Sequence, residues 1–346
     1  MNTEEVCSHL RADARIAPGP ARAAGIRAIQ PAPARPLASP ATPEAATGSA
    51  SGEAIAALGA HPRFADAMRA SAAGIVAMYQ GSRLLNWLMD DRGRLVFGYF
   101  AAYLDFTRDP SDPSSGLTPT GMKALCAECE LCSPGRVVVM LSLMRAAGYL
   151  ASEPAAEDRR RRRLRATDRL IALLRERWRI HFEAMAPLLP DGAAMLGALD
   201  DPAFARALIR VMGDRFRRGF RLLRHAPGLD LFGERNAGIL ILASLLATGD
   251  GDDTMPPSRA VPISISALAR RFAVSRPHVL KLLRDAAARG LIERSGRDGD
   301  HILIRPPLAA GAQNFFATLC LFFADGARRA MREIETGPEI ICTWGH

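Results

Sequence analysis

One stretch of about 40 residues, from Ile263 to Arg305, constrains the fold most, because its breaks and apolar positions fall in a fixed order. Ser266 is expected to cap a first short helix, since a serine oxygen can accept a hydrogen bond from a free amide at a helix start. Ala273 and Val274 form the expected turn, and Ser275 is expected to cap a second helix. The pattern predicts two short helices joined by a tight turn.

The second predicted helix and its exit are well marked. Pro277 lies in the first turn, where a missing amide hydrogen costs little, and Gly290 suits the left-handed conformation that ends many helices. Residues 292–294 and 301–305 alternate as two strands around a tight turn at 296–299. The residues expected to face inward are Leu268, Ala269, Phe272, Val279, Leu282, Leu283 and Ala286.

This layout resembles the winged helix-turn-helix of bacterial transcription regulators, in which the second helix enters the major groove of DNA. The basic residues expected on its exposed face and at the hairpin tip are Arg276, His278, Lys281, Arg284 and Arg297. Arg276 and His278 are placed to contact base edges, and Lys281 and Arg284 to reach phosphates. Arg297 is placed for an adjacent minor groove or a phosphate. The alternatives are a helical hairpin with a solvated basic face and a winged helix that contacts only proteins.

Residues 117–165 repeat the layout in a weaker form. Ser133 corresponds to Ser275, and Pro134 follows it at the first helical position. The residues expected to face inward are Val138, Leu141 and Met144. The exposed positions are poorer in base-contacting residues, namely Arg136, Ser142 and Arg145, and of these Arg136 is the candidate DNA contact.

A charged hairpin tip follows within residues 151–165. It contains five consecutive arginines, namely Arg159, Arg160, Arg161, Arg162 and Arg163. Asp158-Arg159, with Leu164 and Ala166-Thr167 further on, resembles the wing of MarR-type regulators and its exit into a long dimerisation helix. The resemblance implies an arginine in the minor groove, held by the aspartate; narrow A·T-rich grooves attract such a side chain. Five arginines also bind phosphates without sequence preference, and a solvated charge run is the alternative.

The resemblance covers about 117–190 and, less closely, 263–335. It implies a mainly α fold with small β-wings, in which two winged helix-turn-helix modules are joined by long helices as a pseudo-dimer. Residues 1–52, rich in Pro, Ala, Gly and Ser, are expected to be disordered; 53–190 form the first module with its flanking helices, and 191–346 the second. MarR proteins are short chains that dimerise, so this longer chain is expected to be a monomeric pseudo-dimer or a homodimer. Two unrelated helical domains are the alternative.

The net charge of +9 comes almost entirely from arginine, because Lys123 and Lys281 are the only lysines. A basic chain suits a polyanionic partner, although a GC-rich genome also favours arginine. The longest apolar runs, 239–247 and 315–323, are shorter than the roughly 18–20 residues of a membrane span. No secretory signal is visible, and six cysteines then indicate reduced thiols in the cytoplasm.

Three cysteines follow a regular spacing, Cys126-x-x-Cys129-x-x-Cys132. A fourth metal ligand is missing, since Arg136 stands where a ferredoxin-type run has its next cysteine. Aligned with the second module, Cys126 and Cys132 fall on core positions and Cys129 falls on an exposed one. The prediction is a set of structural cysteines without metal or other cofactor; a redox switch at an exposed Cys129 and a metal site are the alternatives.

We expect a sequence-specific regulator of transcription that binds double-stranded DNA and is not an enzyme, because no phosphate-binding loop, dinucleotide fingerprint or nucleophile elbow is present. The alternative is a winged-helix scaffold that binds a protein or senses a ligand or oxidant. Aromatic residues precede the weaker motif at 117–165, namely Tyr79, Trp87, Phe97, Tyr99, Phe100 and Tyr103. By analogy with MarR-type proteins they could bind a small apolar or phenolic effector; plain core packing is the alternative.

Overall fold

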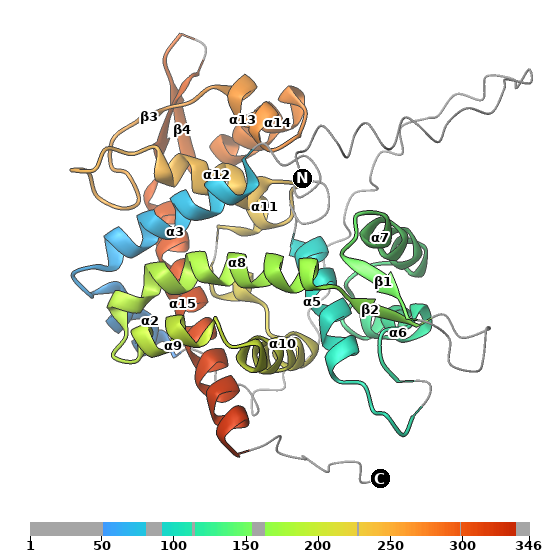
Figure 1. Ribbon diagram of the computed structural model, residues 1–346. Coiled ribbons are helices and arrows are strands. Elements are labelled where there is room, and N and C mark those ends of the chain that lie inside the picture. The colour runs from blue at the N-terminus through green and yellow to red at the C-terminus, as the bar shows by residue number, and fades with distance from the viewer. Residues whose placement is uncertain are drawn as a thin grey trace, which may run out of the picture. The chain divides into compact units, whose positions relative to one another are not determined.

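The computed structural model describes residues 51–80, 92–112, 115–153, 163–226, 228–297 and 299–336. It confirms a mainly α-helical chain with two small antiparallel sheets (Figure 1). The predicted disordered segment lies outside these residues except at its end, where Ser51 caps a helix that begins at Gly52.

The first half of the chain contains six helices and a hairpin among its described residues. In order they are α2 (Gly52–Gly59), α3 (Phe64–Tyr79), α5 (Arg92–Phe106), α6 (Pro119–Glu128), α7 (Pro134–Ala146), β1 (Leu150–Ser152), β2 (Leu164–Ala166) and α8 (Asp168–Met185). β1 and β2 pair antiparallel, with Leu150 opposite Ala166.

The second half follows a similar order. After the short helix η1 (Ala186–Leu188), which ends the first half, its elements are α9 (Gly192–Ala198), α10 (Pro202–Arg217), η2 (Leu222–His225), α11 (Asp230–Gly233), α12 (Gly238–Ala247), β3 (Val261–Pro262), α13 (Ile265–Arg271), α14 (Arg276–Ala288), β4 (Ile292–Ser295), β5 (His301–Ile304) and α15 (Pro306–Thr336). The three strands form one antiparallel sheet in the order β3-β5-β4. Strand β3 was not predicted, because it has only two residues and contains Pro262, which cannot donate to a sheet.

The halves match in backbone detail over α7 and α14. Ser133 and Ser275 lie 142 residues apart, and each caps its 13-residue helix by accepting a hydrogen bond from the amide three residues further on. Gly148 and Gly290, also 142 residues apart, end these helices with φ of +75° and +67°. Only glycine adopts this left-handed conformation without a steric penalty. The predicted cap Ser275, its counterpart Ser133 and the predicted helix end Gly290 are confirmed here, whereas the cap of α13 is Ser264 and not Ser266.

The helices of the two halves pack in a crossed pattern. The 16-residue helix α3 packs against α8 of its own half and α12 of the other. The 16-residue helix α10 likewise packs against α15 of its own half and α5 of the other. The short helix α2 contacts α15, and α9 contacts α8. Each half therefore buries apolar surface of the other, and all described elements belong to one compact unit.

The long helix α15 has the length and hydropathy of a membrane-spanning helix, which the shorter apolar runs in the sequence did not suggest. In the folded chain 61% of its most apolar 18-residue window is buried. Its aromatic side chains pack on those of other helices: Phe323 lies against Phe182 of α8 and Phe316 against Phe64 of α3. These contacts are those of a core helix.

Candidate nucleic-acid interface

The segment from β3 to β5 (residues 261–305, hereafter the second segment) holds α13 and α14 in a fixed relation. Ala273 has φ of +54° and turns the chain between them, and the Val274 amide donates to Ala269 O at 3.1 Å. The side chains predicted to face inward are all buried, namely Leu268, Ala269, Phe272, Val279, Leu282, Leu283 and Ala286. The opposite face of α14 is therefore presented to solvent.

Three basic side chains stand on that exposed face: Arg276, Lys281 and Arg284. Neither Arg276 nor Arg284 forms an ion pair with any described residue, so both guanidinium groups are open to a ligand. Lys281 lies 3.6 Å from Asp285, one turn further along the helix. Arg276 also lines an open groove with Ser266 and Arg270 of α13.

His278 differs from the prediction, because it is half-buried and does not belong to the exposed basic face. Its Nε2 donates a hydrogen bond to Asn236 O, 2.9 Å away, in the connection between α11 and α12. That connection lies against α14, and Arg235 in it forms a 3.0 Å ion pair with Asp285. His278 therefore anchors α14 to the helical part of the chain.

The second hairpin projects Arg297 at its turn, where the side chain is exposed. Ile292 pairs with Ile304, and the strands continue to Ser295 opposite His301. The turn is closed by a hydrogen bond from the Gly299 amide to Gly296 O at 3.3 Å. The tight turn predicted at 296–299 is confirmed, and Arg297 occupies the most distal described part of the hairpin.

In the first segment (residues 117–167), the inward face of α7 agrees with the prediction at Leu141 and Met144 and differs from it at Val138. Val137, Met140, Leu141 and Met144 are buried, whereas Val138 is 46% exposed and Val139 is 55% exposed. The continuous apolar run from 137 to 141 gives no helical phase, so the predicted face was one residue out of register at Val138. Arg136 is exposed at the start of the helix, as predicted.

The arginine run of the first hairpin is described only at its end. Arg159, Arg160, Arg161 and Arg162 lie outside the described residues. Arg163 differs from the predicted solvent-facing run, because its side chain is only 18% exposed and lies 3.4 Å from the carboxylate of Glu153. Glu153 also pairs with Arg108 at 2.8 Å. Arg163 thus stabilises the base of the hairpin.

Cys129 is buried, which corrects the prediction of an exposed thiol. Two arginines at and just after the end of α10 lie against this part of the chain: Arg221 donates from Nη2 to Cys129 O at 3.2 Å, and Arg217, the last residue of α10, pairs with Glu128 at 2.8 Å. Burial raises the pKa of the Cys129 thiol. The Cys126 thiol is also buried, and its pKa is raised by a hydrogen bond with Cys132 and by burial. Both thiols are therefore held in the unreactive protonated form.

Of the aromatic residues that precede the first segment, Trp87 lies outside the described residues. The others either pack in the core or line a cavity. Phe97 and Phe100 are core residues. Tyr103 donates to Asp214 at 2.7 Å, and burial together with this bond raises its pKa to about 12. Tyr79 and Tyr99 line a cavity among the helices, described below.

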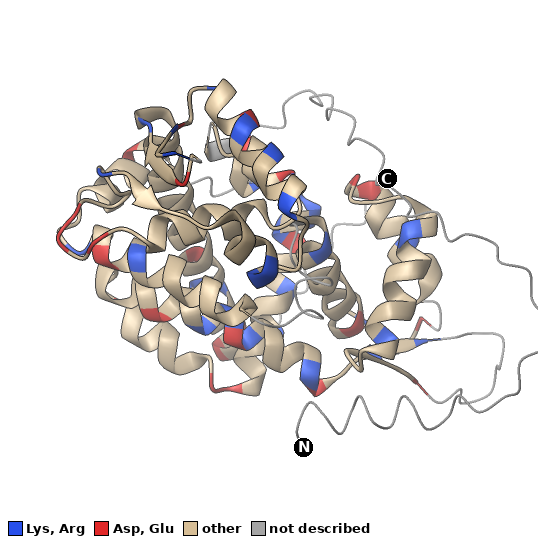
Figure 2. Cartoon of the chain, turned by 90° about the horizontal axis from the view of Figure 1, so that it is seen from above, with Lys and Arg blue, Asp and Glu red and all other residues tan. Residues whose placement is uncertain are grey.

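Among the described residues, most of the arginine charge is distributed through the fold and is not gathered on one face. Basic and acidic positions are interspersed along the ribbon in Figure 2. Arg328 pairs with both carboxylate oxygens of Asp191, at 2.6 and 2.9 Å, and Arg215 lies 2.9 Å from Asp325. The basic composition therefore says little by itself about a nucleic-acid interface. The unpaired arginines of α14 are the stronger evidence for one.

Comparison with known proteins gives no relative from which a role could be transferred. No protein-family model, no curated protein and no solved structure matches this chain.

Proposed function

We propose that this chain is a sequence-specific regulator of transcription that binds double-stranded DNA through winged helix-turn-helix modules. The supporting observation is α14, which buries a complete apolar stripe and exposes Arg276, Lys281 and Arg284 beside a hairpin tipped by Arg297. A helix of this kind fits the major groove, where arginine pairs with guanine through two hydrogen bonds. The tip arginine is placed to follow the neighbouring backbone or minor groove.

The proposal includes two modules in one chain, 53–190 and 191–346, related as a pseudo-dimer similar to a MarR-type dimer. Its support is the shared order of elements, the 142-residue spacing of caps and helix ends, and the crossed packing of α3 and α10. Two modules related by an approximate two-fold axis bind half-sites about one helical turn apart. The expected state is a monomer; an obligate dimer in light scattering would contradict the single-chain arrangement.

The two modules differ in their exposed helices, so the proposed DNA site is asymmetric. α14 offers arginines, whereas α7 offers Arg136 together with the exposed valines Val138 and Val139. The second module would therefore supply base contacts, and the first mainly backbone contacts, with residues 159–162 in the minor groove. The chain needs no cofactor or metal for this role, performs no catalysis, and would work in the cytoplasm.

A second candidate is a scaffold whose first module binds a protein. Val138 and Val139 favour it, because exposed branched side chains on a helix that fits a groove add no affinity for phosphates. The unpaired arginines of the second module are present under either candidate. A measurement of DNA binding by α14 therefore distinguishes the regulator from the scaffold.

The deciding experiment measures binding of the full chain to genomic DNA fragments across a salt series. Contacts with about six to eight phosphates give a slope of roughly −0.9 per phosphate in log K against log salt. The Arg276→Ala/Arg284→Ala variant should bind more weakly with a shallower slope, while a control, Arg179→Ala on the outside of α8, should leave both unchanged. Absence of binding at low salt would contradict the proposal and leave the scaffold.

A further inference from the structure

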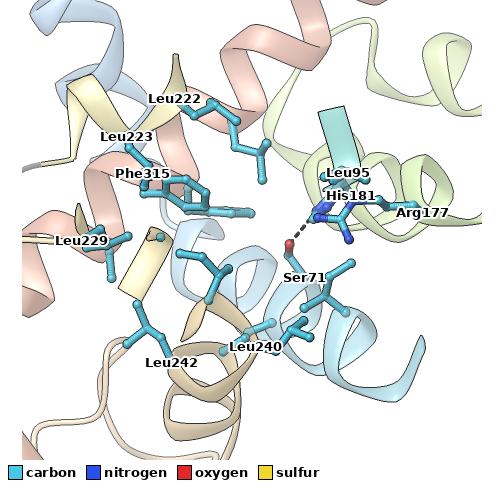
Figure 3. A pocket seen from close by; sticks show the side chains of 18 of the residues that line it. Ser71, Leu95, Arg177, His181, Leu222, Leu223, Leu229, Leu240, Leu242 and Phe315 are labelled. Carbon is cyan, nitrogen blue, oxygen red and sulfur yellow. Dashed lines mark hydrogen bonds between the residues drawn. The ribbon is translucent and has the colours of Figure 1, made fainter. Parts of the chain in front are cut away.

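A cavity of about 190 Å³ lies among α3, α5, α8, α10, α12 and α15 and the segment from η2 to α11. Most of the described residues that line it are leucine, isoleucine, methionine and phenylalanine. Figure 3 shows Ser71, His181 and Arg177 gathered at one side, away from Leu223 and Leu229. Ser71, His181 and Arg177 therefore form a polar side of the cavity, and the rest of its described wall is mainly apolar.

The polar side combines a neutral hydrogen-bonding pair with a cation. Ser71 Oγ and His181 Nδ1 lie 2.9 Å apart, and burial, with a smaller effect of Arg177, lowers the pKa of His181 to about 3. Arg177 donates from Nη1 to the Tyr79 hydroxyl at 3.0 Å. No described carboxylate lies within ion-pair distance of Arg177, and none of the described residues that line the cavity is acidic.

The other arginine at the cavity, Arg235, is already paired with Asp285 at 3.0 Å. Arg177 is thus the cation available to a ligand. An arginine binds a carboxylate through parallel hydrogen bonds, and such bonds are stronger where water is excluded.

We propose that this cavity binds a small apolar monocarboxylic acid, with its carboxylate on Arg177 and its hydrocarbon part among the leucine and phenylalanine side chains. A cavity of about 150 Å³ lined by apolar residues holds benzene. By that ratio the present cavity holds about eight non-hydrogen atoms, which suits the seven-carbon hydrocarbon part of octanoate, with its carboxylate on Arg177 at the polar side.

One segment of the chain both lines the cavity and contacts α14. Leu229 and Gly233, at the two ends of α11, line it, as does Arg235. This same segment holds α14 through Asn236 with His278 and through Arg235 with Asp285. A bound acid that displaces α11 would shift α14 as well, so it would alter DNA affinity at the second module. This last step rests on the DNA-binding function proposed above.

The test is calorimetric titration of the full chain with octanoate and with octanamide, which has nearly the same shape and no charge. We expect octanoate to bind with a Kd below 1 mM and octanamide to bind at least tenfold more weakly. Arg177→Met should abolish this difference, whereas Arg179→Met should preserve it, because Arg179 is paired with Asp200 at 2.7 Å outside the cavity. No octanoate binding at 5 mM, or equal effects of the two variants, would overturn the proposal.

A second titration repeats the DNA measurement with octanoate present. Coupling predicts a changed DNA affinity in the wild-type chain and no change in Arg177→Met, and by reciprocity DNA should change octanoate affinity by the same factor. Octanoate binding without any DNA binding would support the cavity site and contradict the regulator. DNA binding without octanoate binding would overturn the cavity site alone.

Discussion

His278 on α14 donates a hydrogen bond from Nε2 to the main-chain oxygen of Asn236, 2.9 Å away. The donor belongs to the helix that exposes Arg276 and Arg284, and the acceptor belongs to the connection between α11 and α12. The contact between His278 and Asn236 therefore fixes how α14 is oriented, and with it the direction in which its exposed face points. A histidine that sequence reasoning placed against DNA bases instead sets the position of its neighbours.

His278→Ala should consequently act through stability. Loss of a partly buried hydrogen bond should lower the free energy of unfolding by about 1 kcal/mol. Binding to all DNA sequences should weaken together, because α14 loses its support. Urea unfolding and a selection of bound fragments check this expectation. Unchanged stability with a new ranking of preferred sequences would instead assign His278 to base contact.

Arg276→Ala should change which sequences are preferred. If the guanidinium contacts guanine through two hydrogen bonds, its loss costs about 1–3 kcal/mol on the best site and much less on unrelated DNA. Arg284→Ala, further along the same face, is the matched comparison and should weaken all sequences alike. Equal losses on specific and unrelated DNA in both variants would assign both arginines to phosphates.

Val137→Ala and Val138→Ala should lower the free energy of unfolding by clearly different amounts, although the two valines are adjacent. Val137 is fully buried, so removing two methyl groups should cost about 2 kcal/mol in unfolding free energy, including the cavity left behind. Val138 is 46% exposed and its replacement should cost less than about 0.5 kcal/mol. Chemical unfolding of both variants measures this, and similar costs would contradict the helix phase described here.

The second segment was predictable because its apolar residues alternate with charged ones. Arg276, Lys281 and Arg284 fix one face of α14, so Val279 and Leu282 can only occupy the other. In α7 the run Val137–Leu141 is apolar throughout, and the phase of that helix depends on tertiary contacts. Periodicity therefore succeeded where polar residues interrupted the pattern.

Other features were not predicted because they depend on contacts between residues that are far apart in the sequence. Cys129 is covered by Arg221, which lies 92 residues further along the chain, and His278 is covered by Asn236, 42 residues before it. The cavity was missed for the same reason, since Ser71 and His181 meet only when α3 packs on α8. The aromatic residues before the first segment hinted at a ligand site, but they did not reveal Arg177.

Cys126 and Cys129 should react slowly in the folded chain. Burial raises the pKa of Cys129, and the bond with Cys132 together with burial raises that of Cys126, so few thiolates are present at neutral pH. With Cys7 and Cys342 replaced by serine, modification by iodoacetamide should be at least tenfold slower in the native chain than in urea. Mass spectrometry identifies the sites. Rapid native modification of Cys129 would restore the redox-switch alternative.

His181 should make the chain less stable in mild acid. Its pKa is about 3 in the folded chain, because burial disfavours the charged form, and about 6.5 when unfolded. Between these values the unfolded chain binds the extra proton, so stability is complete above pH 6.5 and falls as the pH is lowered toward 3.

His181→Asn does not titrate and can keep a bond to Ser71, so it is the control. The stability difference between wild type and variant should shrink by about 2 kcal/mol from pH 6.5 to 5. Urea unfolding at several pH values measures both chains, and parallel profiles would show that His181 is not buried in its neutral form.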